Sequence, residues 1–305
     1  MKKTILILGA LLGAMLWTGC EKMEEDLIGE KTEVAPEQPA GSYKLTIEAY
    51  KGVDTKALAL DGSTLNAHWV TGEKVAVYLE GYGTYLGMLT ATADDTDNTK
   101  ATLSCTLDNV EGVTSGSFLM LLYPRAVFDY TEQDGSAPNE DGSMATKYDY
   151  ATATVTVAAT DGNIITTSTA SFVNQQSIYR FGFKIGGVGD RISVKEFTVS
   201  SDHKQLVTNR RFSGIEWTPT YGNLTVTPAS ATDALLYVSM CNDNTEIGKV
   251  DKLSFYVIGG TDNALYVGDL DIPGEKLGNG KFMSAQSVSV SKSDLAKSGT
   301  VTEVW

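Results

Sequence analysis

The chain has 305 residues, with 38 acidic residues against 24 Lys and Arg, so its formal net charge is −14. This length is enough for two domains of ordinary size. A strongly acidic surface is repelled by phosphate backbones, which argues against nucleic acid as a partner.

Residues 1–19 have the features of a lipoprotein signal peptide. Two lysines precede a short apolar run from Ile5 to Leu16, and Thr-Gly comes directly before Cys20. The run is too short to span a bilayer with ease. We therefore expect cleavage before Cys20 and acylation of its thiol and new amine, which would attach the chain to membrane lipid. Trp17 stands where bacterial lipoproteins usually carry Leu.

Residues 20–42 are predicted to be a tether without packed structure. The stretch begins with an acidic run over residues 21–26 and later contains Pro36 and Pro39. Such an acidic run after a lipidated cysteine resembles the signal that exports lipoproteins of some Gram-negative anaerobes to the outer leaflet. We therefore expect a surface-exposed protein, anchored by lipid in the cell outer membrane. Without residues 1–19, 22 basic residues remain against 38 acidic, for a net charge of −16.

From Tyr43 onward, apolar and polar residues alternate with a period of two. Thr, Val, Tyr and Ser dominate these runs, as half-buried strands require. A continuous apolar run, Phe118 to Tyr123, is expected to be a strand buried on both faces. The sequence therefore predicts an all-β protein built as sandwiches or barrels. The alternating runs are 43–50, 75–79, 101–107, 152–158, 179–185, 192–199, 224–227, 235–240, 253–258 and 288–290.

We expect two β domains, spanning residues 43–171 and 172–305. The polar stretch from Asp129 to Tyr150 is interpreted as a long surface loop of the first domain. Cys105 and Cys241 then fall in different domains. A disulfide between them is an alternative in an oxidising compartment, although two separately buried thiols are the preferred interpretation.

No catalytic motif emerges from the chain. His68 precedes Trp69 at a predicted strand start, where a structural role is the better interpretation, and His203 stands alone. Two acidic clusters, 94–97 and 139–142, contain oxygen ligands suited to Ca²⁺, but their spacing is that of solvated loop tips. We therefore expect no enzyme, no cofactor and no metal site.

Three segments resemble the fimbrillin family of lipoproteins, the type V pilins. They are Thr55 to Gly62, Asn66 to Tyr78 and Phe172 to Phe181. Members of this family fold as two tandem Greek-key, transthyretin-like β-sandwiches. The resemblance therefore implies this architecture and a role as a fimbrial subunit that supports adhesion.

The resemblance also implies a mechanism of assembly. In a pilin of this type, the first strand completes its own sheet until a protease cuts after it, and a strand from the next subunit then takes its place. Tyr43 to Tyr50 matches that first strand, and the cut is expected after Lys56, leaving Ala57 as the new N-terminus. Family members present Arg to the protease, but the first arginine here is Arg125. Either a lysine-tolerant protease cuts this chain, or it is never cut.

The donor strand is expected in the C-terminal tail, between Ser287 and Trp305. Val288, Val290, Val301 and Val304 are the candidate inserting side chains. The alternative is that this tail forms the last strand of the chain's own second domain. The implied partners are other pilin subunits, of the same or related sequence, the membrane lipid on Cys20, and a ligand on a host or bacterial surface.

Two other functions remain open. The first is a surface lipoprotein that does not polymerise, either a pilus anchor or an adhesin for a glycan or protein. Its 14 Tyr and 4 Trp would suit sugar stacking as well as sandwich cores. The second is a glycan-processing enzyme, which needs two facing carboxylates that no local motif proposes.

Overall fold

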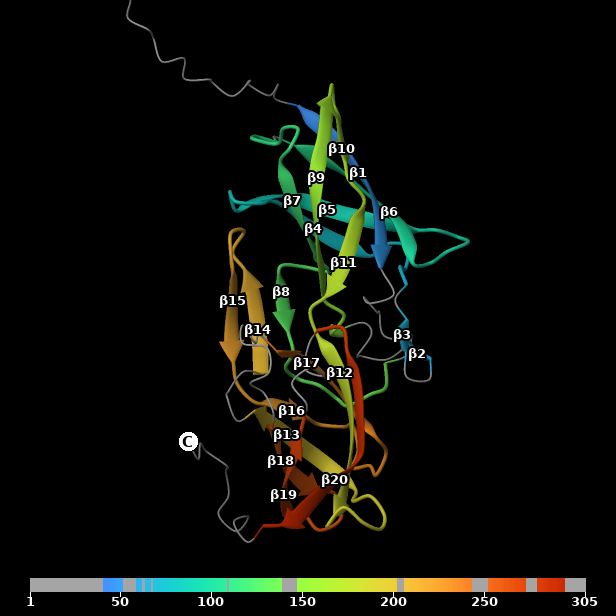
Figure 1. Cartoon of the computed structure of the whole chain (residues 1–305), viewed down its shortest axis with the longest axis vertical. Helices are drawn as coiled ribbons and strands as arrows, with labels where there is room; N and C mark the ends of the chain where they lie inside the picture. Colours follow the sequence, from blue (N-terminus) through green and yellow to red (C-terminus); the bar gives the residue numbers. More distant parts are fainter. Residues whose placement is uncertain are drawn as a thin grey trace, which may run out of the picture. The chain divides into compact units, whose positions relative to one another are not determined.

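The computed structural model describes residues 41–51, 59–61, 64–66, 68–108, 110–138, 147–201, 206–242, 252–272 and 279–293. The chain divides into two compact units, Met1–Glu37 and Gln38–Trp305, and every described residue lies in the second. The described elements are all strands, so the prediction of an all-β protein is confirmed (Figure 1). No helix in these ranges is long and apolar enough to cross a membrane.

Eight strands form the first sheet. They are β1 (Ser42–Lys51), β4 (Lys74–Leu79), β5 (Thr84–Ala93), β6 (Lys100–Asp108), β7 (Phe118–Tyr123), β9 (Ala151–Asp161), β10 (Ile164–Thr167) and β11 (Ala170–Asn174). Their order is β10-β1-β11-β9-β7-β4-β5-β6, and β1 also pairs with β6. Because β1 is hydrogen-bonded to strands from both ends of this order, the sheet closes on itself at β1.

Ten strands form the second sheet. They are β8 (Val127–Asp129), β12 (Ser177–Ile185), β13 (Val194–Ser201), β14 (Leu206–Phe212), β15 (Trp217–Tyr221), β16 (Leu224–Val226), β17 (Leu236–Asn242), β18 (Lys252–Gly259), β19 (Leu265–Asp271) and β20 (Phe282–Lys292). Their order is β15-β14-β17-β12-β20-β19-β18-β13-β16, and β8 pairs with β14. A separate hairpin joins β2 (Ala59–Asp61) to β3 (Thr64–Asn66).

Alternating side chains give each sheet one buried face. In β1 every second residue from Tyr43 is buried, and β9 buries alternate Ala and Val residues in the same way. The first core gathers these side chains with those of β4 to β7, whereas the second core contains the aromatic cluster Phe181, Phe183, Phe197 and Phe255. Burial of this apolar surface is the main stabilising contribution.

The expected central strand is β7, which pairs with β4 on one edge and β9 on the other. Leu119 and Leu121 point into the first core, and Leu122 packs on the other face with Ala76 and Phe212. The prediction of burial on both faces is therefore confirmed for this strand, although Phe118 at its start is half exposed.

The expectation of a surface loop from Asp129 to Tyr150 is wrong for the described part of that stretch. Tyr130, Tyr148 and Tyr150 are fully buried in the core of the second sheet. Gln133 fixes the same segment to β17, because its amide oxygen accepts from Ser239 N at 2.7 Å and its amide nitrogen donates to Ser239 O at 2.7 Å. The segment therefore lies between two strands of the first sheet in the sequence, β7 and β9, but packs with the second sheet.

The chain enters the second sheet first at β8, returns to the first sheet for β9 to β11, and enters the second sheet again at β12. The predicted division between residues 171 and 172 lies inside β11, which pairs with β1 and β9. A division into two folding units at this position stays a prediction. In the sheet topology, β11 belongs to the first sheet and β12 to the second.

Replacing one buried side chain of β1 tests this arrangement. We expect Ile47→Ala to lower the free energy of unfolding by about 3 kcal/mol, because it leaves a cavity in the first core. Thr46→Ala on the exposed face of the same strand should cost less than about 1 kcal/mol. Urea unfolding of both variants measures the difference. Equal losses would mean that β1 does not insert with this face inward.

Candidate functional site

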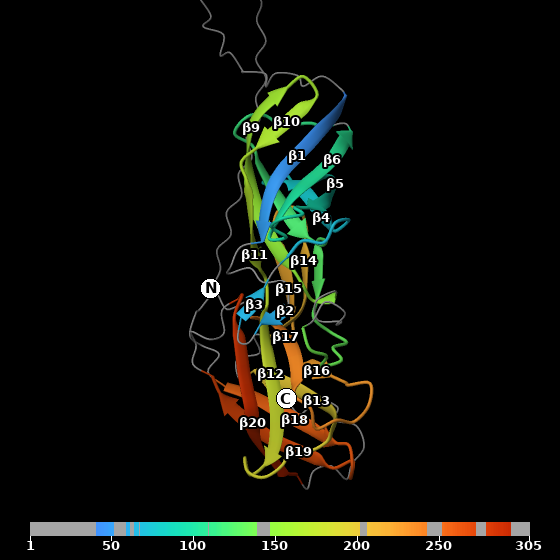
Figure 2. The ribbon, with the colours of Figure 1, turned by 90° about the vertical axis from the view of Figure 1, so that its right-hand side faces the viewer.

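The strand β1 is the candidate site because both of its edges are paired. It is antiparallel to β6 over nine residue pairs, from Ser42↔Asp108 to Tyr50↔Lys100. On its other edge it is parallel to β10 and β11, with Ala49 to Lys51 facing Ala170 to Phe172. Figure 2 shows β1 between these neighbours. Since a parallel neighbour is not joined by a hairpin, β1 is held there by pairing and packing alone.

The inward face of β1 is apolar over four positions and then ends in a charge. Tyr43, Leu45, Ile47 and Ala49 are at most 2% exposed. The next inward residue is Lys51, which is also buried. Burying a lysine is costly unless its ammonium group is paired, so its surroundings need to compensate for the lost water.

Three acceptor groups surround the ammonium group of Lys51, and one of them, Glu73, presents both of its carboxylate oxygens. Its Nζ lies 3.2 Å from Glu73 Oε2 and 3.7 Å from Asp149 Oδ2, and it donates to the His68 carbonyl at 3.2 Å. Glu73 is also bound by the hydroxyl of Tyr123, and its Oε2 accepts from Val70 N at 3.0 Å. The carboxylates therefore come from the start of β4 and from just before β9.

Aromatic rings enclose the same group. Lys51 Nζ lies 4.3 Å from the ring centroid of Trp69 and 4.1 Å from that of Tyr123. Trp69 in turn makes edge contacts with Tyr123 and with Phe172 of β11. The negative faces of these rings stabilise a cation without offering it water. We call Lys51, Glu73, Asp149, Trp69 and Tyr123 the lysine cluster.

The electrostatics of the lysine cluster show how strongly it is buried. Burial raises the pKa of Asp149 to about 6, the Lys51 charge opposes this shift, and the charge of Glu73 adds to it. Burial, followed by the charges of Asp149 and Glu73, also raises the pKa of Tyr123 far above its usual range. Above about pH 6 Asp149 is therefore ionised, and its charge is favoured by Lys51 and disfavoured by Glu73.

The residues predicted for processing lie outside the described ranges. These are Cys20, Lys56 and Ala57, together with Val301 and Val304 of the tail. β1 ends at Lys51 and β2 begins at Ala59, so Lys56 belongs to the connection between these two strands.

The two described residues of the predicted donor strand are part of β20. Val288 pairs with Phe183 and Val290 with Ile185, both in parallel register with β12. Both valines are buried in the second core. In this structure they therefore contribute to the chain's own second sheet and not to the site around β1.

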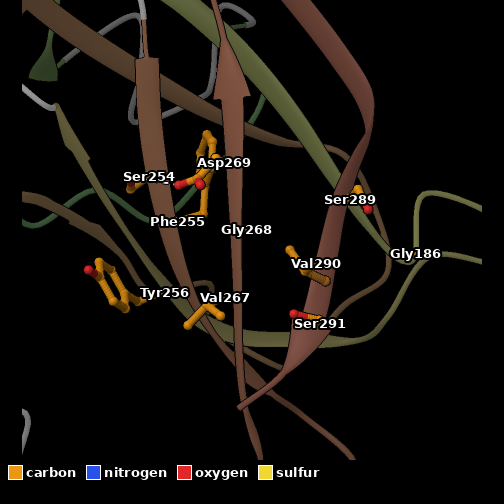
Figure 3. A pocket seen from close by; sticks show the side chains of 10 residues that line it. All are labelled: Gly186, Ser254, Phe255, Tyr256, Val267, Gly268, Asp269, Ser289, Val290 and Ser291. Atoms are coloured by element: carbon orange, nitrogen blue, oxygen red, sulfur yellow. Dashed lines mark hydrogen bonds between the residues drawn. The ribbon is translucent and has the colours of Figure 1, made fainter.

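The second sheet carries another candidate site, an open groove. β19 and β20 pair only at Tyr266↔Lys292 and Val267↔Ser291, and beyond them an open groove of about 470 Å³ lies over β18, β19 and β20 (Figure 3). Ser254 donates to Asp269 at 2.8 Å there. The lining residues, all described, include one carboxylate and no histidine or cysteine, so β1 is the stronger candidate.

The two cysteines and the acidic loop at residues 94–97, which the sequence also singled out, make contacts that stabilise the fold. Cys105 of β6 and Cys241 of β17 form no disulfide and lie by different cores; Cys241 is buried as expected, whereas Cys105 is only partly buried. Burial raises the pKa of the Cys105 thiol to about 11. In the acidic loop, Asp94 accepts from Thr96 and Asp97 pairs with Lys100 at 2.8 Å. His203 and residues 139–142 lie outside the described ranges.

Sequence reasoning missed the lysine cluster. One signal was available, because Lys51 has the same parity as Tyr43 to Ala49 and therefore faces inward if β1 continues to it. Glu73 and Asp149 gave no such signal, since one follows a turn at Gly72 and the other stands in a polar stretch.

Comparison with known proteins gives distant structural similarities. No known family profile matches the chain, and no curated protein matches it. Among solved structures, it is similar to a proposed cell adhesion protein of Bacteroides uniformis (TM-score 0.41, 13% identity, covering 82% of this chain and 96% of that one). It is also similar to a proposed cell adhesion protein of Bacteroides ovatus (TM-score 0.43, 12% identity, covering 84% of this chain and 97% of that one). A third similar structure is a fimbrial assembly protein of Parabacteroides distasonis (TM-score 0.41, 11% identity, covering 83% of this chain and 94% of that one).

The buried carboxyl group of Asp149 predicts a specific pH dependence. Its pKa in the folded protein, about 6, lies above the ordinary value of 3.8. The folded state therefore binds this proton more tightly, and the resulting stabilisation is complete below pH 4 and lost as the pH rises through 6. Relative to Asp149→Asn, the wild-type free energy of unfolding should fall by on the order of 2–3 kcal/mol from pH 4 to 7.

Urea unfolding at several pH values measures both profiles. Glu132→Gln serves as a control, because Glu132 is an exposed carboxylate whose replacement should leave the wild-type profile nearly unchanged. Parallel profiles for wild type and Asp149→Asn would contradict a buried, ionisable Asp149.

Proposed function

We propose that the chain is a cell-surface fimbrial subunit that assembles by strand exchange triggered by proteolysis. One observation carries this proposal: β1 pairs on both edges and closes the first sheet, yet the chain reaches the next strand of that sheet, β4, only through the connection of residues 52–73. A single cut in that connection leaves β1 held by non-covalent contacts alone. The closing strand then becomes replaceable.

Departure of β1 would create a strong binding site. The edges of β6 and of β10 with β11 would lose their partner, and the first core would lose four buried side chains. Exposed strand edges readily pair with another chain. A strand from a second subunit would restore both ladders by β-strand addition, and repetition of this head-to-tail contact gives a filament.

The incoming strand would come from the C-terminal tail of the next subunit. Val288 and Val290 are committed to β20 in this chain, so the donor segment in our proposal lies beyond that strand and includes Val301 and Val304. Before the cut, acylated Cys20 would hold the precursor at the outer membrane; after it, the subunit would enter the fimbria. This role is structural and requires no cofactor.

A second candidate is a subunit that keeps β1, as a pilus anchor or surface adhesin. The lysine cluster favours it, because the buried Lys51 adds an ion-paired attachment at the end of β1 next to the connection. In such a subunit the lipid on Cys20 would remain joined to the folded protein.

Limited proteolysis separates the two candidates. We expect trypsin at low dose to cut the purified, unlipidated precursor once after Lys56, giving Ala57 as the new N-terminus. Ladders that resist unheated SDS should follow, because each subunit then offers an open sheet and a free tail. N-terminal sequencing and gel electrophoresis measure both events.

Lys56→Gln is the matched variant and should remain uncut and monomeric under the same conditions. If wild-type protein is cut after Lys56 and stays monomeric, strand exchange fails for this chain and the anchor or adhesin function takes its place.

A further inference from the structure

The lysine cluster makes the position of β1 selective as well as replaceable. When β1 leaves, Lys51 leaves with it, but Glu73 remains just ahead of β4 and Asp149 just ahead of β9. With a strand in this position the side chain of Asp149 is only 4% exposed, so an occupant without a cation would bury its charge unpaired. An unpaired charge in such a position is strongly destabilising.

We infer that the slot left by β1 selects its new occupant by charge: it accepts an extended strand of a second subunit that carries apolar side chains at alternate positions followed by a lysine at the position of Lys51. This inference rests on the proposed strand exchange. It adds a chemical requirement on the partner that the backbone ladders alone do not impose. In this chain's own tail Lys292 and Lys297 precede Val301 and Val304, so the inferred partner is a related subunit whose donor strand carries the lysine after its apolar residues.

The geometry favours lysine over arginine at this position. An ammonium group has three donors, and the cluster presents three acceptor groups to it, the carboxylates of Glu73 and Asp149 and the His68 carbonyl. The rings of Trp69 and Tyr123 lie within 4.3 Å of Nζ on its remaining sides. A planar guanidinium group is larger and needs its five donors satisfied in a fixed fork, which this enclosed space does not match.

The same cluster fixes the register of the occupant. Lys51 pairs with Phe172 of β11, and the adjacent Tyr50 ends the ladder with β6 at Lys100. A slip by one residue would turn the apolar face outward, whereas a slip by two would keep that face inward and move the lysine out of the cluster. The two carboxylates therefore penalise the slip that the alternating pattern alone would tolerate.

Peptide exchange into the cut, full-length precursor tests the inference. A recognition site for a specific protease, inserted between Lys51 and Ala59, ensures the cut. Fluorescent peptides with the sequence of Ser42 to Lys51 then compete with the resident β1, and anisotropy reports their incorporation. The panel contains the wild-type peptide, Lys51→Met, Lys51→Arg and the matched control Lys44→Met, which removes an equal charge from the exposed face of the same strand.

We expect the wild-type and Lys44→Met peptides to bind equally well, and Lys51→Met to bind roughly 100-fold more weakly at pH 7.5. Lys51→Arg should also bind more weakly than wild type. At pH 5 the loss for Lys51→Met should shrink, because Asp149 then carries a proton and needs no cation. A role in packing alone would not change with pH in this way.

The possible failures are distinguishable. Equal binding of wild-type and Lys51→Met peptides would overturn selection by charge and leave strand exchange standing. If even the wild-type peptide fails to enter the cut protein, the slot does not open, and both strand exchange and the selection built on it are wrong.

Discussion

Hydrogen bonding of β1 along both edges is the constraint on which the first sheet depends. Nine residue pairs join it to β6, and five join it to β10 and β11. Backbone groups that stay buried without a partner cost about 1–3 kcal/mol each, so a strand in this position stabilises the sheet. The backbone ladders alone place few demands on the sequence of the occupant, so any further selectivity has to come from side chains such as Lys51.

Local patterns in the sequence were sufficient for this part of the fold. Alternation from Tyr43 to Ala49 predicted a strand with one buried face, and the apolar run at Phe118 predicted a central strand. The stretch from Asp129 to Tyr150 misled us, because its polar composition concealed isolated tyrosines that pack in a distant core. Pairing of β8 with β14 joins residues some eighty positions apart, and no local period reports such a contact.

The lysine cluster illustrates why a site is harder to predict than a strand. Its members come from the end of β1, the start of β4, the end of β7 and the segment before β9, so no spacing in the sequence connects them. A lysine at the end of a strand is normally solvent-exposed, and only the parity of Lys51 indicated otherwise. The chemistry becomes visible when the closed sheet brings Glu73 and Asp149 to the same end of β1.

Gln133 has a consequence for how this chain can be divided. Its side chain bonds to the backbone of Ser239 much as a neighbouring strand would, and it does so from a segment that precedes β9 in the sequence. Residues from the first half of the chain thus form part of the core of the second sheet. The parts of the chain before and after β12 therefore cannot be exchanged separately between related proteins. A chimera joined at that point would separate the second core from Tyr130, Tyr148 and Tyr150, which complete it.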